Sequence, residues 1–208
     1  QGWPVIPSPK LAVVASNLAH APFHSPPASL LPPGYAVAPG PRGRYEAMIA
    51  AADGLLGAIL SSVDLHTTLV VILADNGTPS QVAPDALRAK ETTYERGIRI
   101  PLVIAGGPTV GGGRQAGDLV ALVDVWATLV EAGSGCAYAD GVSLMPILLD
   151  DPRQAPREWV LSGAGADVCS IRSDETKLRQ VGGIFEFYDL ASDPQEQTNL
   201  ISDPAMAS

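Results

Sequence analysis

Apolar runs and one helical pattern organise the first part of the chain. Residues 10–16, 69–74 and 100–105 are short apolar runs with the composition of buried parallel strands. Between the first two, residues 44–63 repeat apolar side chains at steps of three and four, which predicts a helix with one apolar face. The residues of that face are Tyr45, Met48, Ile49, Ala52, Leu56, Ile59 and Val63. Strand, helix and strand in this order predict a βαβ unit, so the expected fold class is α/β.

Proline and glycine mark the remaining boundaries. The Pro-rich residues 20–41 predict a loop, because proline disfavours helix interiors and central strands. Residues 106–117 predict a glycine-heavy surface loop, and residues 119–132 predict a helix that ends at Gly133. After residue 140, short segments separated by turn residues predict an antiparallel meander. These segments are residues 159–161, 168–172, 177–181 and 184–188.

Composition and charge narrow the class of protein. The chain has 208 residues, of which 46% are hydrophobic and 17% charged, so it can bury a sizeable core and is not intrinsically disordered. The net charge of −9, with no basic stripe, excludes a non-specific nucleic-acid binder. A local cationic cluster can nevertheless bind an anionic substrate. No apolar run of about 18 residues predicts a membrane span, and the oligomeric state stays open.

The two cysteines do not define a site. Cys136 and Cys169 are too far apart for a CxxC pair and match no metal-ligand spacing. A disulfide and two small core or loop residues are both compatible with this pattern. The cysteines therefore do not decide the redox compartment.

An acidic and an amide side chain follow directly after the second apolar run. Asp75 and Asn76 offer hard oxygen donors, the ligand type that Ca²⁺ and Mg²⁺ prefer. Sites in open α/β sheets form at the carboxyl ends of strands, where this pair is predicted to lie. We expect Gly77 to allow the sharp turn that lets both side chains face one point. Because Asp-Asn-Gly is also a common turn sequence, the metal-site hypothesis depends on the accompanying motifs.

Two further segments accompany this turn. Residues 90–101 have the pattern K-x-T-x-Y-E-x-G-I-R-x-P, which begins at Lys90, and residues 20–26 have the pattern H-x-P-F-x-x-P, which begins at His20. Together with the strand and its Asp-Asn-Gly turn, this order of motifs resembles the sulfatase family of the alkaline-phosphatase-like superfamily. Residues 122–129, 140–144 and 171–200 resemble that family's scaffold, so the resemblance covers nearly the whole chain.

The resemblance implies a fold and a reaction. The fold is expected to be part of an alkaline-phosphatase-like sandwich with a mostly parallel sheet over residues 1–140. A small C-terminal antiparallel α+β subdomain is expected over residues 141–208. The implied reaction is that of a sulfuric ester hydrolase of the arylsulfatase type, which cleaves the sulfate ester of a small molecule or a carbohydrate. By family analogy the expected location is periplasmic, secreted or lysosomal.

The resemblance also implies site residues. Asp75 and Asn76 are expected to bind Ca²⁺, in preference to Mg²⁺, and Lys90 to hold a sulfate oxygen with its ammonium group. His20 is expected to contact the sulfate ester as a general acid or hydrogen-bond donor near the leaving oxygen. Glu95 and Arg99 are predicted to form a structural ion pair that holds the following turn. Two other positions beside the site, Glu91 and Arg96, carry charged residues where the family usually has glycine.

Part of the family pattern is absent from this sequence. The family's nucleophile is a formylglycine made from the first residue of a C/S-x-P-x-R motif, and no such motif occurs here. The family's first pair of metal-binding aspartates is also absent. We therefore expect the chain to correspond to the C-terminal portion of a sulfatase, with the N-terminal half missing. Alone it is expected neither to hydrolyse sulfate esters nor to bind calcium tightly, and to leave apolar faces uncovered.

Two alternatives stay open at this point. The first is a phosphodiesterase or phosphonate hydrolase of the same superfamily, although the K-x-T-x-Y-E motif favours sulfate. The second is a non-catalytic, sulfatase-like scaffold or relic. Retention of His20, Asp75 and Asn76 together with Lys90 argues against the second alternative, because a scaffold does not need that set of polar groups.

Overall fold

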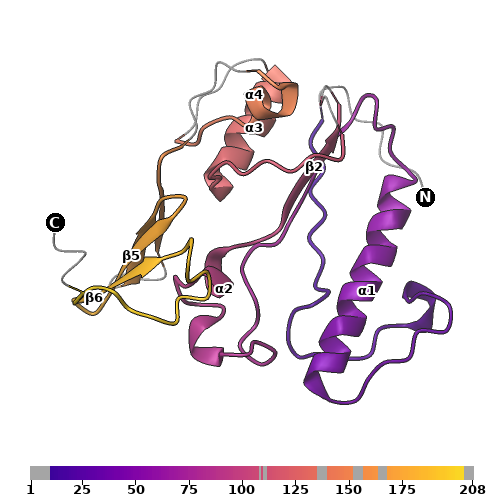
Figure 1. Ribbon diagram of the computed structural model, residues 1–208. Coiled ribbons are helices and arrows are strands. Elements are labelled where there is room, and N and C mark those ends of the chain that lie inside the picture. The colour runs from indigo at the N-terminus through magenta and orange to yellow at the C-terminus, as the bar shows by residue number, and fades with distance from the viewer. Residues whose placement is uncertain are drawn as a thin grey trace.

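A long helix and a short two-stranded ribbon form the N-terminal part of the structure. The computed structural model describes residues 10–107, 109, 112–134, 140–151, 157–163 and 168–203. Helix α1 spans Gly40–Leu60, after a Pro-rich loop that contains one short 3-10 turn, η1 (Ala28–Leu30). Strands β1 (Leu69–Leu73) and β2 (Leu102–Gly106) pair with each other in a ribbon that lies beside α1 (Figure 1). The predicted loop, the helix and these two strands are confirmed.

The pairing of β1 with β2 is antiparallel, so the prediction of a mostly parallel sheet is wrong for the described residues. Parallel neighbours need a crossover connection, usually a helix that carries the chain back along the sheet. Here the two ends of the connection between β1 and β2 are joined by backbone hydrogen bonds instead. The Gly77 amide donates to the Gly97 carbonyl at 2.9 Å, and the Thr78 amide donates to the Arg96 carbonyl at 2.8 Å. Strand β2 therefore begins at the end of the ribbon where β1 finishes.

Residues 10–16 are extended but do not form a strand, so the prediction of a strand there is wrong. A strand requires a hydrogen-bonded neighbour, and none pairs with this segment among the residues described. Its apolar side chains are consequently exposed, with Val13 81% accessible. Ile49 of α1 and Trp126, in a later helix, are also about half exposed, at 46% and 56%. The expected uncovered apolar faces are thus confirmed.

Hydrogen bonds and an ion pair of one buried aspartate hold the two helices that follow the ribbon together. Helix α3 spans Leu122–Ser134, close to the prediction, and a short helix α4 spans Met145–Leu149. The buried carboxylate of Asp124 accepts a hydrogen bond from the Val142 amide at 2.7 Å and pairs with Arg157. These contacts attach the turn before α4 to the first turn of α3.

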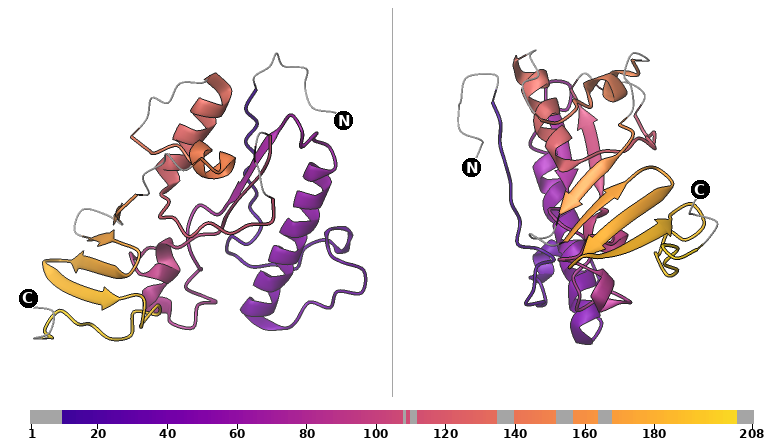
Figure 2. Two further views of the ribbon diagram at one scale, coloured as in Figure 1. Left: turned by 45° about the horizontal axis from the view of Figure 1, so that its top comes forward. Right: turned by 90° about the vertical axis from the view of Figure 1, so that its left-hand side faces the viewer.

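The C-terminal segments form a four-stranded antiparallel sheet, which confirms the predicted meander. Its strands are β3 (Val160–Gly163), β4 (Val168–Arg172), β5 (Thr176–Val181) and β6 (Ile184–Asp189). They pair in the order β3-β4-β5-β6 and form one twisted layer (Figure 2). Cys169 of β4 carries an exposed, free thiol, whereas Cys136 lies outside the described residues. The boundary between two units at residue 140 stays a prediction.

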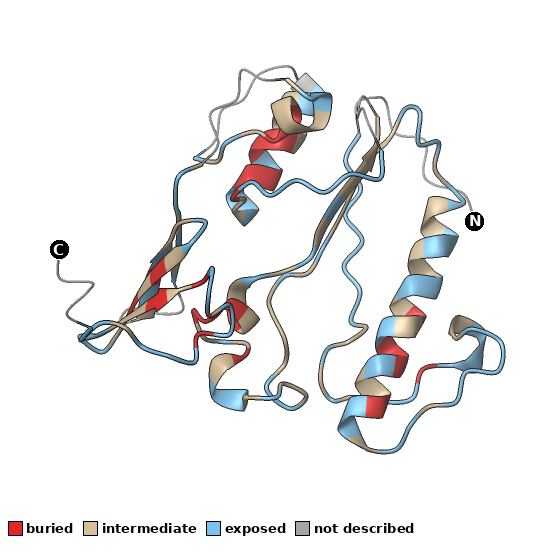
Figure 3. Ribbon diagram, viewed as in Figure 1, coloured by how far each residue is buried: buried red, intermediate tan, exposed pale blue. Residues whose placement is uncertain are grey.

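Buried residues are concentrated in three places: the first half of α1, helix α3, and the junction between the C-terminal sheet and a one-turn helix, α2 (Glu95–Ile98) (Figure 3). At the junction, Tyr94, Tyr188 and Leu190 form the apolar cluster. Within the described parts, the helices are too short or too polar to cross a membrane.

Candidate functional site

The turn that carries Asp75 and Asn76 is packed backbone against backbone on α2. A Cβ atom at Gly77 would collide with the carbonyl groups of Arg96 and Gly97. The chain bends at residues 75–77, as expected, although the φ angle of Gly77 is not positive. Glycine is needed because only a hydrogen in place of Cβ lets the two backbone segments approach closely enough to exchange hydrogen bonds.

Asp75 and Asn76 offer two oxygen donors at the surface of this turn. Asp75 is exposed and Asn76 half-buried, and the Asn76 side-chain amide donates to the Gly77 carbonyl at 3.0 Å, so its Oδ1 is the atom available to a cation. Carboxylate and amide oxygens suit Ca²⁺, which takes about six to eight such ligands. Within the described ranges, no three His, Cys, Asp or Glu side chains gather to hold a metal ion. The pair therefore fits as part of a calcium site and does not complete one.

The backbone places Lys90 against the same turn. The Lys90 amide donates to the Thr78 carbonyl at 2.9 Å, while its neighbour Ala89 is fully buried. The side chain of Lys90 is half-buried, and no carboxylate among the described residues lies within ion-pair distance of its Nζ. Glu91, next in sequence, has a φ angle of 73°, in the left-handed region that favours glycine. Among the described residues, Lys90 thus has no carboxylate partner, and its backbone lies close to the turn that carries Asp75 and Asn76.

His20 lies on a separate loop, and its ring is held by the backbone. Its Nδ1 donates to the Ala21 carbonyl at 2.6 Å, because a carbonyl oxygen can only accept. Nε2 is therefore the ring nitrogen that remains available to a ligand. The ring is exposed, and within the described structure His20 makes no hydrogen bond to Asp75, Asn76 or Lys90.

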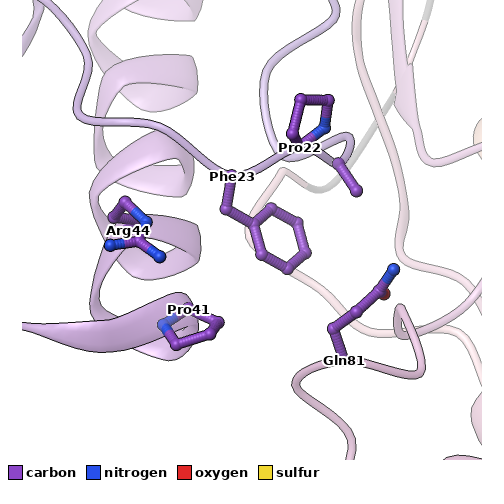
Figure 4. Close-up of a pocket in the computed structure, with 6 residues that line it drawn as sticks. Pro22, Phe23, Pro41, Arg44 and Gln81 are labelled. Carbon is purple, nitrogen blue, oxygen red and sulfur yellow. The ribbon is translucent and has the colours of Figure 1, made fainter.

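A pocket of about 570 Å³ connects the His20 loop with the loop that follows the Asp-Asn-Gly turn. It is lined by Ala21, Pro22 and Phe23, by Pro41 and Arg44 of α1, and by Gln81. Figure 4 shows the Phe23 ring between Arg44 on one side and the Gln81 amide on the other. Phe23 is held by an edge-on contact with Tyr45, with ring centroids 5.3 Å apart. Its lining combines the apolar side chains of Pro22 and Phe23 with the polar side chains of Arg44 and Gln81.

A buried ionic cluster, which sequence reasoning missed, anchors the segment next to Lys90. Lys177 of β5 is fully buried, and its Nζ lies 2.7 Å from Glu95 Oε1 and 2.9 Å from Glu196 Oε1. The predicted pair between Glu95 and Arg99 is present at 4.0 Å, but Arg99 is 71% exposed. Its contribution is accordingly small, and Lys177 is the main partner of Glu95.

An aromatic and carboxylate cluster lies beside these ions. Glu186 of β6 accepts hydrogen bonds from Tyr94 at 3.0 Å and Tyr188 at 3.2 Å, and pairs with Arg179 at 2.6 Å. Burial acts to raise the pKa of Glu186, but the hydrogen bonds from Arg179 and the tyrosines outweigh it and hold that pKa below its usual value. Burial, together with hydrogen bonding to Tyr94, raises the pKa of Tyr188 well above its usual range. Tyr188 thus stays neutral and Glu186 stays charged.

Comparison with known proteins finds a matching family model, similar sequences and similar solved structures. A family model described as Sulfatase matches residues 6–135. Arylsulfatase K of Xenopus laevis is 34% identical over 182 residues, which cover 76% of this chain and 33% of that relative. The structure resembles that of a 2-O GAG sulfatase, with a TM-score of 0.66 and 24% identity over 79% of this chain and 38% of the other. It equally resembles the phosphonate monoester hydrolase of Agrobacterium radiobacter, with a TM-score of 0.66 and 24% identity over 80% and 38% of the two chains.

The extent of these matches decides what they show. The chain spans about a third of the length of the curated relatives it matches. The structural likenesses, at 24% identity, show the shared α/β fold. The family model covers more than half of the chain, including His20, Asp75 and Asn76 together with Lys90. On this evidence the chain belongs to the sulfatase family.

Proposed function

We propose that this chain supplies the C-terminal part of a sulfuric ester hydrolase site. The observation that carries the proposal is the backbone contact between Lys90 and Thr78. It brings the backbone of Lys90 close to the turn that carries two oxygen donors, Asp75 and Asn76, in a chain of the sulfatase family. A divalent cation bound by oxygen ligands and a nearby ammonium together suit an anion whose charge is spread over several oxygens.

Each side chain has a separate task in this proposal. Lys90 binds one sulfate oxygen, and its interaction with a charged group contributes about 1.5–3 kcal/mol. His20 acts through Nε2, since Nδ1–H is occupied by the Ala21 carbonyl. Nε2 carries a proton only when the ring is doubly protonated, and in that form it donates to the oxygen that leaves with the alcohol. Asp75 and Asn76 hold Ca²⁺, which when bound neutralises sulfate charge and activates an attacking oxygen. The remaining ligands and the formylglycine nucleophile are supplied from outside these 208 residues, which contain no C/S-x-P-x-R motif.

The pocket beside His20 is proposed to hold the alcohol portion of the ester. Phe23 offers a flat apolar wall, and Arg44 and Gln81 offer hydrogen-bond donors. A sugar ring, with apolar faces and polar edges, matches this combination. The name of one relative, a 2-O GAG sulfatase, indicates a sulfated carbohydrate as the substrate of that protein. We therefore propose a sulfated carbohydrate as the substrate class here.

A second candidate function has one observation in its favour. The structural resemblance to a phosphonate monoester hydrolase is as strong as that to a sulfatase, with a TM-score of 0.66 in both cases. Phosphorus and sulfur esters have similar tetrahedral, anionic groups, so the fold does not separate them. The K-x-T-x-Y-E pattern that begins at Lys90 favours the sulfate ester.

A pair of chromogenic substrates tests the reaction class. The longest natural protein that contains this sequence is assayed with 4-nitrophenyl sulfate and with 4-nitrophenyl phosphate, alongside the 208-residue chain alone. If the longer protein also carries a C/S-x-P-x-R motif, we expect it to hydrolyse the sulfate in preference to the phosphate. We expect the 208-residue chain alone to hydrolyse neither substrate. Preference for the phosphate would support the second candidate. Rapid hydrolysis by the chain alone would contradict the view that the nucleophile lies elsewhere.

A further inference from the structure

Lys177 makes two ion pairs and one hydrogen bond inside the protein. Its side chain is 0% exposed, and Nζ contacts Glu95 Oε1 at 2.7 Å, Glu196 Oε1 at 2.9 Å and the Thr93 carbonyl at 3.1 Å. The two carboxylates thus balance its charge, and the Thr93 carbonyl accepts its hydrogen bond. A fully buried lysine is rare unless it is paired in this way. Its three partners lie on two segments, residues 93–95 and residue 196, that are far from it in sequence.

The ions around Lys177 balance one another. Glu95 and Glu196 bring two negative charges, and Lys177 and Arg172 bring two positive ones, with Arg172 Nε 3.3 Å from Glu95 Oε1. The second oxygen of Glu196 accepts the Glu95 backbone amide at 2.6 Å. The cluster thus binds the backbone of residues 93–95 as well as its side chains.

Arg179, two residues further along β5, grips the same segment from the side. Its Nε donates to Thr93 Oγ1 at 2.9 Å, and its guanidinium lies 3.9 Å from the centroid of the Tyr94 ring. Arg88, from the turn before Lys90, stacks on the same ring at 4.7 Å. Stacking of guanidinium groups on an aromatic face is attractive and directional. Side chains of the C-terminal sheet therefore hold residues 93–95 at the backbone, at a hydroxyl and at a ring.

The segment held in this way is the one that arranges the candidate site. Residues 96 and 97 accept the backbone hydrogen bonds of Thr78 and Gly77, next to Asp75 and Asn76. Lys90 lies three residues before Thr93 and bonds to the Thr78 carbonyl. The chain from residue 90 to residue 97 therefore joins Lys90 to the Asp75–Asn76 turn, and Lys177 and Arg179 of β5 hydrogen-bond to Thr93 at its centre.

We propose that Lys177 and Glu196 are positioning residues, which fix Lys90 relative to the Asp75–Asn76 turn by anchoring residues 93–95 from the C-terminal sheet. The importance of that position rests on the proposed function, whereas the anchoring itself does not. Ionic clusters that are buried in this way are a poor source of net stability, because apolar residues of similar size often serve as well. Their directional contacts instead specify one register between β5 and the residue 90–97 segment.

Amide hydrogen exchange of the 208-residue chain tests the anchoring without reference to activity. Lys177→Met removes the charge at similar length, Lys177→Met with Glu196→Gln removes one charge of each sign, and Lys10→Met changes an exposed lysine as the matched control. The double variant is included because the single one leaves carboxylates buried without their cation. Exchange is compared between residues 75–97 and helix α3, which contributes none of the described ion pairs of the Lys177 cluster.

The expected result is selective opening. Exchange in residues 75–78 and 90–97 should accelerate about 100-fold in the single variant, which corresponds to about 3 kcal/mol, and at least roughly tenfold in the double variant. Amides of α3 should keep their rates, and Lys10→Met should change neither region. Equal acceleration in every segment, or acceleration confined to β5 and β6, would overturn the proposal.

Kinetics provide the functional readout. In the longer protein that hydrolyses 4-nitrophenyl sulfate, the double substitution should lower kcat/KM at least roughly tenfold. The folded fraction of this variant at assay temperature should match that of Lys10→Met. Unchanged kcat/KM would contradict a positioning role. If the unmutated protein hydrolyses no sulfate ester, the proposed function fails, and the exchange result still decides whether the anchoring is real.

Discussion

Replacing Gly77 with alanine should destabilise the turn that carries Asp75 and Asn76. The added Cβ would meet the carbonyl groups of Arg96 and Gly97, which are main-chain atoms and cannot rotate away. Relief of the collision requires the turn to move off α2, and that movement lengthens the two hydrogen bonds at 2.9 Å and 2.8 Å that close the loop. The perturbation thus acts on the contact that defines the candidate site.

The magnitude follows from these two effects. Overpacking against rigid neighbours costs about 1–3 kcal/mol, and each weakened hydrogen bond costs up to about 1 kcal/mol. We therefore expect Gly77→Ala to lower the free energy of unfolding by about 2–4 kcal/mol. For a chain of this size that loss corresponds to a decrease in Tm of roughly 5–12 °C.

A second glycine provides the matched control. Gly57 lies inside α1, and a Cβ there meets no atom within 4 Å. Gly57→Ala should raise the free energy of unfolding by about 0.5–1 kcal/mol, because alanine loses less backbone entropy in a helix. Urea unfolding of both variants, followed by circular dichroism, gives the comparison. If Gly77→Ala were as stable as Gly57→Ala, the close packing of the turn on α2 would be refuted.

Three other changes give separate tests. Glu91→Gly should stabilise the chain by about 1 kcal/mol in urea unfolding, because it relieves the positive φ angle of 73°; a loss of stability would contradict that strain. Glu186→Gln should destabilise by about 1.5–3 kcal/mol at pH 7. Because the folded pKa of Glu186 is lowered, this difference should shrink as pH falls below about 4.3, and a difference that stays constant to pH 3 would exclude the charged form as its source. Arg44→Gln should raise KM for a sulfated sugar several-fold, whereas Arg42→Gln, an exposed residue paired with Glu46 at 2.9 Å, should not; equal effects would exclude the pocket as the site of binding.

Elements with a strong local signal were predictable from the sequence. Helix α1 follows from its apolar steps of three and four, and the C-terminal meander from short apolar segments between turn residues such as Gly182 and Gly183. Both patterns depend on neighbours in the chain, which is what sequence periodicity records. The sequence motifs likewise identified Lys90 and the Asp-Asn-Gly turn as candidates, and the structure brings their backbones together.

Features that depend on distant partners were not predictable. The parallel sheet was inferred from strand composition, but the direction of pairing depends on which strand lies alongside. Here β1 pairs with β2, the next strand in the chain, which runs back along it in the opposite direction. Polarity places Lys177 and Arg179 on the solvent face of β5, yet both are buried, because the residue 93–95 segment presents acceptors and an aromatic ring to that face. No local pattern contains this information, since the partners are more than 80 residues apart, with separations of 84 and 86.

The most direct test of the account is the effect of Lys90→Met on sulfate ester hydrolysis, with Lys10→Met as the control. Both variants remove one positive charge, but only the first removes it from a residue whose backbone is bonded to the segment that follows Asp75 and Asn76. In the longer protein that hydrolyses 4-nitrophenyl sulfate, we expect Lys90→Met to lower kcat/KM by about 10- to 150-fold and Lys10→Met to leave kcat/KM unchanged. Equal kcat/KM values for the two variants would contradict the assignment of this site.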